Sequence, residues 1–342
     1  MARVVSFLSV LAVLAVLFVL FSCSSSPLSS NSVYVSTSGN DANDGLSPST
    51  PVKTLVKAVE VANTMDKAIN VVIKVSVGSY TPGDGLSSAN TGFVINRPNV
   101  TISGGWSTDF SSVVGKSELD GNNSLYHIIK IEGVTNVIFE NLVIRGGKAN
   151  GSTPDDSGGG VYVNGVSYLT IGDSVVISNN SATNGGGISL FSTLNSKIEG
   201  NLCFNTATNG GGIYLGISSK NTISGNVYSN SAVWGGGGVF LWSSTNNTIS
   251  GAVYSNKANL LGGGVLLYSS PNNTTISSVY ANSANFYGGG LYLTNSDYFT
   301  NTGWITNNTA GSSGGGVYTN GSHPNSSFGN VANNTPNNFN TN

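Results

Sequence analysis

Seven glycine triplets recur at a nearly constant interval from residue 158 onward, and no other feature of the 342-residue chain restricts its fold as strongly. The last glycines of successive triplets are 27, 25, 26, 26, 26 and 26 residues apart. A fixed period of roughly 20 to 50 residues is typical of a solenoid or a similar array. The triplets are Gly158–Gly160, Gly185–Gly187, Gly210–Gly212, Gly236–Gly238, Gly262–Gly264, Gly288–Gly290 and Gly314–Gly316.

Each repeat contains strand-forming runs that are too short to be helices. Residues 210–235, for example, hold three apolar runs of three or four residues, separated by turns rich in Asn, Ser and Gly. Stacked coils of this kind form a parallel β-helix, in which each coil adds one strand spacing of roughly 4.8 Å. We therefore predict an all-β parallel β-helix over residues 93–330, with about 26 residues per coil.

The repeated columns predict which side chains face the core. The first and third residues after each triplet are aliphatic everywhere except at Thr319, and strand alternation points them inward together. A third inward column and an asparagine column follow at the same period. We expect the asparagine amides to hydrogen-bond from coil to coil, and asparagine at such a turn also tolerates left-handed backbone angles. The third column is Ile177, Leu202, Val227, Val253, Val279 and Ile305, and the asparagines are Asn180, Asn205, Asn230, Asn256, Asn282 and Asn308.

Residues 33–92 precede the repeats and have a different pattern. Val33–Val35 and Val71–Val77 alternate or cluster apolar residues between turn signals, which predicts two strands. The intervening segment 41–45, Asp-Ala-Asn-Asp-Gly, suits a self-bonded Asx turn. A calcium loop is the alternative, although the distal bidentate acid of an EF-hand is missing.

A short helix is predicted between these two strands. Pro51 suits the first helical position, Ser49 or Thr50 suits the N-cap, and apolar residues then follow at i, i+3, i+4 and i+7. The pattern ends near Asn63. Strand, turn, helix and strand in this order resemble the N-terminal unit of pectate-lyase-like right-handed β-helices. The resemblance implies a right-handed coil whose open end, with its apolar core and unpaired edges, is covered by the helix.

The repeats themselves resemble a second group of proteins. Over residues 158–320, each coil pairs an element such as Gly-Gly-Gly-Ile with one such as Val-Tyr-Ser-Asn. This pairing is similar to the repeats of bacterial polymorphic outer-membrane proteins, which are surface adhesins. The resemblance implies surface binding or a structural role at a cell envelope. Residues 331–342 are rich in asparagine and are predicted to form a tail beyond the last coil.

The N-terminus carries an apolar run with the features of an export signal. Residues 1–22 hold one basic residue, Arg3, followed by 18 uncharged residues from Val4 to Phe21. Leu20-Phe21-Ser22-Cys23 resembles a bacterial lipobox, which implies lipidation of Cys23 and a flexible tether over residues 23–32. We expect a protein anchored to the outer membrane or cell surface through Cys23. An uncleaved anchor helix is the alternative.

The composition argues against nucleic-acid binding and against a disulfide framework. Charged residues make up 8% of the chain and the net charge is −2, which excludes the basic stripe that nucleic-acid binding requires. Cys203 is the only cysteine besides Cys23, so no disulfide framework is expected. Its apolar neighbours, Leu202 and Phe204, are typical of a buried thiol that acts as a small hydrophobic residue. No cofactor and no metal site is predicted.

The distribution of acids decides where catalysis could occur. Glycoside hydrolysis needs two carboxyl groups on one face, and β-elimination needs a base. From residue 200 onward the charged residues are Lys220, Lys257 and Asp297, so we assign no catalytic residue to the regular coils. If the chain is instead a polysaccharide lyase or glycosidase, Asp155 and Asp156 are the first candidates. A solvated loop is the alternative interpretation of this pair.

Aromatic residues supply the candidate ligand-binding site. Alternation places the second and fourth residues after each triplet on the outer face of the sheet, where aromatics recur along the coils. Such rows are able to stack on sugar rings or contact a partner protein. Ordinary packing between neighbouring strands is the alternative. The predicted binding residues are Tyr214, Phe240, Trp242, Tyr268 and Tyr292.

Overall fold

The structure is a computed structural model that describes residues 31–86, 90–323 and 328–341. Two compact units are distinguished, Met1–Asn31 and Ser32–Asn342, and every described element lies in the second. The predicted export signal and Cys23 fall outside the described residues. Among the residues described, no helix is both long and apolar enough to cross a membrane.

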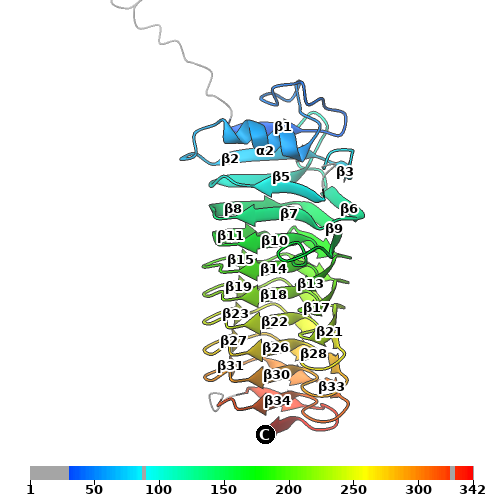
Figure 1. The fold of residues 1–342 in the computed structure, drawn as a ribbon, viewed down its shortest axis with the longest axis vertical. Coiled ribbons are helices and arrows are strands. Elements are labelled where there is room, and N and C mark those ends of the chain that lie inside the picture. The colour runs from blue at the N-terminus through cyan, green and yellow to red at the C-terminus, as the bar shows by residue number, and fades with distance from the viewer. Residues whose placement is uncertain (1–30, 87–89, 324–327, 342) are drawn as a thin grey trace, which may run out of the picture. The chain divides into compact units, whose positions relative to one another are not determined.

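The second unit is a parallel β-solenoid whose described strands form three sheets of 10, 10 and 16 strands (Figure 1). Within each sheet, a strand pairs in parallel with the equivalent strand of the next coil. The first sheet, sheet A, consists of β1 (Ser32–Val35), β2 (Val71–Ser76), β5 (Val100–Trp106), β8 (Thr135–Glu140), β11 (Ser167–Ile171), β15 (Lys197–Ile198), β19 (Thr222–Ile223), β23 (Thr248–Ile249), β27 (Thr274–Thr275) and β31 (Thr300–Asn301).

Sheet B contains the strands that follow the glycine triplets. It consists of β4 (Thr91–Ile95), β7 (His127–Glu132), β10 (Val161–Asn164), β14 (Ile188–Phe191), β18 (Ile213–Gly216), β22 (Val239–Trp242), β26 (Val265–Tyr268), β30 (Leu291–Thr294), β34 (Val317–Asn320) and β36 (Phe339–Thr341).

Sheet C has two arms, which meet at the long strand β9. The first arm is β3 (Gly78–Tyr80), β6 (Ser117–Leu125), β9 (Leu142–Ala149), β12 (Val176–Ser178), β16 (Asn201–Cys203), β20 (Val227–Tyr228), β24 (Val253–Tyr254), β28 (Val279–Tyr280), β32 (Trp304–Thr306) and β35 (Asn330–Ala332). The second arm is β13 (Ser181–Asn184), β17 (Thr206–Asn209), β21 (Ser231–Gly235), β25 (Lys257–Ala258), β29 (Ser283–Ala284) and β33 (Thr309–Ala310). Each regular coil therefore has four short strands, where the sequence predicted three.

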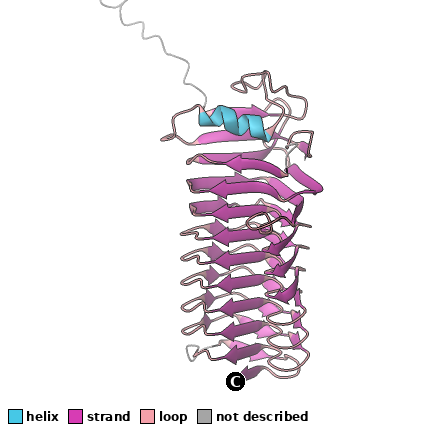
Figure 2. Ribbon diagram, viewed as in Figure 1, coloured by secondary structure: helices cyan, strands magenta, loops and turns pink. Residues whose placement is uncertain are grey.

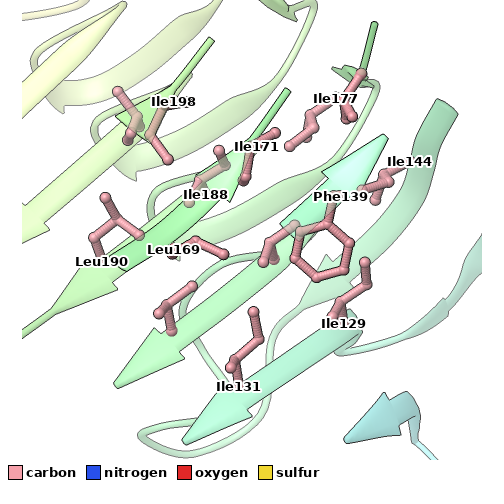
Figure 3. Close-up of a cluster of buried hydrophobic side chains, with 14 of the residues drawn as sticks. Ile129, Ile131, Phe139, Ile144, Leu169, Ile171, Ile177, Ile188, Leu190 and Ile198 are labelled. Atoms are coloured by element: carbon pink, nitrogen blue, oxygen red, sulfur yellow. The ribbon is translucent and has the colours of Figure 1, made fainter. Parts of the chain in front are cut away.

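The core lies between the sheets and consists of the predicted inward columns. Val239 and Leu241, the first and third residues after one triplet, are fully buried, and so is Val227 of the third column. Neighbouring coils present equivalent aliphatic side chains to one another, as Figure 3 shows for Ile171 and Ile198 and for Ile144 and Ile177. Because each coil covers the next, the apolar interior is continuous along the solenoid.

The asparagine column turns the chain between the two arms of sheet C. Each backbone N–H donates to the side-chain oxygen of the asparagine one coil further on, at 2.8 to 3.0 Å. The predicted coil-to-coil hydrogen bonds are confirmed. The left-handed backbone that such a turn needs is found at the residue before each asparagine, whose φ lies between 54° and 56°. These residues are Asn179, Phe204, Ser229, Ser255, Ala281 and Asn307.

Each glycine of a triplet meets a separate steric requirement. Gly185 has a φ of +64°, which L side chains rarely adopt. A Cβ on Gly186 would lie 2.4 Å from the carbonyl oxygen of Thr206, and one on Gly187 would lie 2.7 Å from that of Gly212. The triplet is therefore a corner at which successive coils approach each other too closely for any side chain.

One helix, α2 (Leu55–Asn63), is found among the residues described, and it packs at the N-terminal end of the solenoid (Figure 2). Its predicted end at Asn63 is confirmed, but its predicted start is wrong. The N-cap is Thr54, whose side-chain oxygen accepts from the N–H of Lys57. Asp41 Oδ1 accepts hydrogen bonds from the N–H groups of Lys53 and Thr54 just before the helix. The predicted Asx turn is present, since Asp44 Oδ1 accepts from the N–H of Leu46.

The strands also continue past residue 330, where the sequence predicted a tail. β35 pairs with β32, and β36 pairs with β34. The asparagines of this segment extend the ladder, because Asn334 Oδ1 accepts from the N–H of Asn308 at 2.8 Å. The predicted boundary is wrong because asparagine, taken as a sign of a tail, is also the residue that the coil corners use.

Candidate functional site

The outer face of sheet B carries the predicted aromatic row, but part of that row is covered. Phe240 and Tyr292 point away from the aliphatic core, as alternation predicts, yet they are 4% and 7% exposed. They form a second apolar cluster with Leu266 and Tyr318, and the partly buried side chains of Trp234, Leu261 and Tyr287 pack against it. The prediction that Phe240 and Tyr292 are accessible is therefore wrong.

The rings are covered because the later coils have one more residue between the asparagine corner and the glycine triplet than the coil of β17 has. In the pairing of β17 with β21, only Thr208 lies between Ala207 and Asn209, whereas Val233 and Trp234 lie between Ala232 and Gly235. The longer segment bulges, which leaves Val233 59% exposed and brings the Trp234 ring to 5.7 Å from that of Phe240. Alternation predicts the face of a strand but not the segment that folds over it.

Trp242 and Tyr268 remain accessible at the fourth position after their triplets. They are in-register partners on β22 and β26, and they are 37% and 38% exposed. The equivalent residue on β18 is Gly216, where a Cβ would lie 2.8 Å from the Phe191 ring and 2.9 Å from the Tyr214 ring. This glycine leaves a depression before the two exposed rings.

A groove of about 510 Å³ opens at this point. Tyr214 at one end is half-buried, and burial raises its pKa to about 12. The groove begins where the covering row begins, because Trp234 is the first covering residue. One coil earlier, Thr208 alone stands where Val233 and Trp234 lie. We call this depression the aromatic groove; it is lined by Thr208, Asn209, Tyr214, Trp234, Phe240, Trp242 and Tyr268.

A smaller pocket of about 200 Å³ adjoins the aromatic groove and shares Tyr214 with it. The loop 151–157, which joins β9 to β10, contributes Thr153, Pro154 and Ser157 to its wall. Residues 151–156 form turns and bends, which agrees with the interpretation of Asp155 and Asp156 as part of a loop. The other lining residues are Tyr162, Asn164, Asn184, Ser189 and Phe191.

The two candidate acids lie in this loop, and Asp155 contacts a histidine. Asp155 Oδ1 is 3.3 Å from Nε2 of His127, which is fully buried. His127 Nδ1 lies 3.1 Å from the carbonyl oxygen of Gly158, and its ring stacks on Tyr162 at 5.1 Å. Burial lowers the pKa of His127, and the Gly158 carbonyl and Asp155 carboxylate oppose that effect.

Asp156 holds the loop in place. Its side chain accepts hydrogen bonds from the hydroxyls of Ser157 at 2.9 Å and Thr153 at 3.1 Å. Its backbone oxygen accepts from the N–H of Thr183 at 2.7 Å. These contacts serve the loop's own conformation, as expected for a structural carboxylate.

Two other groups of reactive residues lie away from the aromatic groove. Cys203 is buried, and burial raises the pKa of its thiol, which keeps it protonated and unreactive. Arg145 forms ion pairs with Glu118 and with Asp120, the latter at 2.9 Å, on the first arm of sheet C. Within the described ranges, no three His, Cys, Asp or Glu side chains are arranged to hold a metal ion.

Four of the predicted binding residues, Tyr214, Phe240, Trp242 and Tyr268, line the aromatic groove, but the residues of its other wall were not predicted. Thr208, Asn209 and Trp234 belong to the segment between the asparagine corner and the triplet. The change in repeat length from 25 to 26 residues marks this wall, because the additional residue is inserted there.

Fold and site together define a right-handed parallel β-helix with an aromatic groove on one sheet. The sequence model described as "Right handed beta helix region" matches residues 99–278, which is more than half of the chain. The chain therefore belongs to the right-handed β-helix family, and the predicted right-handed parallel β-helix is confirmed. No curated protein sequence matches it.

Two solved structures are similar to the chain in fold. Pectate lyase Pel9A has 15% sequence identity and a TM-score of 0.45, with coverage of 90% of this chain and 78% of that one. The GH136 lacto-N-biosidase from Eubacterium ramulus has 12% identity and a TM-score of 0.38, with coverage of 91% and 67% respectively. Similarities this distant carry no information on ligand or reaction.

Proposed function

We propose that the protein binds glycans through the aromatic groove and serves as a binding module on a cell surface. The observation that carries the proposal is the adjacent pair Trp242 and Tyr268, whose exposed rings occur in register on neighbouring coils and line the groove. The faces of aromatic rings are electron-rich, so the C–H groups on the apolar face of a sugar ring pack well against them.

The polar residues of the groove supply the directional contacts that a sugar needs. Thr208 is exposed and offers a hydroxyl, and Asn209 is held in place because its Nδ2 donates to Asn184 Oδ1 at 2.9 Å. Apolar walls with a few fixed polar groups are typical of small-ligand sites. The neighbouring coils hold these groups on strands rather than on free loops, which favours a preformed site.

Replacing Trp242 and Tyr268 together with Ser tests the proposal. We expect the double variant to keep the fold, because both rings are partly exposed and lie outside the aliphatic core. Binding on a glycan array, followed by titration calorimetry of the strongest ligand, should weaken at least tenfold, since an aromatic anchor contributes about 2 kcal/mol or more.

The matched control replaces two exposed aromatics on other sheets, Trp304 and Tyr168, with Ser. These are 53% and 57% exposed, and their loss should leave binding unchanged. Equal binding by the wild type and the Trp242→Ser/Tyr268→Ser variant would rule the groove out. A carbohydrate-active enzyme is the second candidate, because the loop that carries Asp155 borders the site. Release of reducing or unsaturated ends that Asp155→Asn abolishes would favour it.

We also propose that the protein is exported and anchored by lipid at Cys23. The support is the apolar run before Leu20-Phe21-Ser22-Cys23 and the serine-rich segment after it. Cells that express the full chain should incorporate radioactive palmitate, and Cys23→Ser should abolish the label. Cys203→Ser, which changes the other cysteine, should retain it. Unlabelled wild-type protein in the membrane fraction would contradict lipidation.

A further inference from the structure

Building on the proposed function, we infer that the aromatic groove takes an electrically neutral glycan chain that lies parallel to the solenoid axis. The first support is the chemistry of the lining. All seven residues of the aromatic groove are uncharged, and so are all nine residues of the adjoining pocket. A polyuronate would bring a carboxylate on every sugar, and neither lining offers a Lys or Arg to receive it.

The charges closest to the site are unfavourable to an anionic ligand. Burial raises the pKa of Tyr162 in the smaller pocket, and the carboxylates of Glu132, Asp156 and Asp155 raise it further. Lys130 is the cation on the same side, but its Nζ lies 3.4 Å from Glu132 and 5.7 Å from the Tyr162 ring, so its charge is already paired. The end of the site that is nearest to charge is therefore negative.

The cations of the later coils do not change this balance. Lys220 and Lys257 are the basic residues after residue 200, and neither lines the aromatic groove or the smaller pocket. A neutral glycan needs hydroxyls, amides and aromatic faces instead. The two depressions supply those groups through Thr208, Asn209 and the rings of Trp242 and Tyr268.

The direction of the chain follows from the parallel register. Tyr162, Tyr214 and Phe240 occupy equivalent positions on β10, β18 and β22, so the depressions line up across the strands. The aromatic groove and the smaller pocket share Tyr214. From β10 to β26 there are four strand steps, on the order of 19 Å at roughly 4.8 Å each. An extended oligosaccharide fits this line, whereas a single sugar would occupy only part of it.

A charge series at Thr208 tests the inference. Thr208 is exposed and lines the groove, so its replacement changes the local charge without disturbing the core. We would compare Thr208→Lys, Thr208→Glu and the neutral control Thr208→Gln by affinity electrophoresis. The gels would contain neutral β-glucan, xylan, galactan or arabinan, or the acidic polygalacturonate or alginate with calcium chloride.

We expect retardation by at least one neutral polysaccharide and by neither acidic one. The Lys and Glu variants should bind that neutral ligand within about twofold of each other, and raising NaCl from about 0.05 M to about 0.5 M should not release it. Binding of an acidic polysaccharide that Thr208→Lys strengthens and Trp242→Ser/Tyr268→Ser abolishes would overturn neutrality and leave the proposed function standing. Retardation by none of the six polysaccharides would overturn both.

Discussion

At the scale of single residues, the asparagine corner explains how a chain with few charges holds its coils together. The side-chain oxygen of Asn230 accepts from both the N–H and the Nδ2 of Asn205, at 3.0 and 3.1 Å. Its own Nδ2 donates to the Leu202 carbonyl and to Asn256 Oδ1, both at 3.0 Å. A buried amide with all these partners joins three coils, which no aliphatic side chain can do.

We expect Asn230→Ala to destabilise the protein by about 3 kcal/mol, because it removes the side-chain acceptor of the buried Asn205 N–H and one partner each of Asn205 Nδ2 and the Leu202 carbonyl. Thermal unfolding monitored by circular dichroism measures the loss. Asn285→Ala, at an exposed turn position on a later coil, should change stability by less than about 0.5 kcal/mol. Similar melting temperatures for the two variants would show that the ladder is not a source of stability.

The sequence predicted this ladder because an amide that recurs at a fixed period in a solenoid is well placed to bond from coil to coil. It did not predict the ladders at the opposite corner. There the N–H groups of Ser196, Asn221 and Asn247 donate to the next asparagine side chain, and a serine ladder runs beside them. Serine and asparagine are also the commonest turn residues, so composition alone does not separate a buried ladder from an exposed turn.

At the scale of elements, the loop 151–157 is joined to the solenoid through a buried titratable group. In the neutral form of His127, Nδ1–H donates to the Gly158 carbonyl and Nε2 carries a lone pair toward Asp155. Lys130 lies on the same strand, and its positive charge disfavours protonation of the His127 ring. The protonation state of His127 therefore decides whether Nε2 is able to donate a hydrogen bond to Asp155 of this loop.

The burial of His127 predicts how stability depends on pH. Because burial lowers its pKa in the folded state below the ordinary value of 6.5, the unfolded chain binds the proton more tightly. The stabilisation is fully present above pH 6.5 and is lost as the pH falls below it, by at most about 1.4 kcal/mol per pH unit. Melting temperatures of the wild type and His127→Gln, measured from about pH 8 to about pH 5, should converge at the acidic end.

His323 provides the control for this experiment. Its side chain is 89% exposed and lies on another coil, so His323→Gln tests whether replacing a histidine that is not buried gives the same result as His127→Gln. Parallel profiles of the wild type and His127→Gln would contradict a titrating role for His127.

Most of the strands and their inward side chains could be predicted from the sequence, but the cover over the outer face of sheet B could not. The inward columns and three of the four strands of each regular coil followed from period and alternation, and the structure agrees with these. The exposure of Phe240 and Tyr292 was predicted wrongly, because the bulge that carries Trp234 and Tyr287 over them arises in a different strand of the coil. Tertiary cover of this kind depends on the path of a neighbouring segment, and local periodicity contains no information on it.

At the scale of the whole second unit, the fold could be predicted almost completely and the site only in part. Each coil repeats the same sequence pattern, so a single coil that departs from the pattern does not change the predicted fold. The aromatic groove, by contrast, is lined by residues of particular coils. It depends on the particular coil in which Gly216, Asn209 and Trp234 come together, and a pattern averaged over the repeats removes that information.

The change from a 25-residue to a 26-residue repeat has a further consequence for assembly of the chain. Nearly identical coils can pair with the wrong neighbour, one full period out of step, and still match aliphatic with aliphatic and amide with amide. The segment that holds Thr208 is one residue shorter than its successors, so a displaced coil placed against it would misalign at the glycine corner. This shorter segment therefore favours the correct alignment of the coils over an alignment that is shifted by one coil.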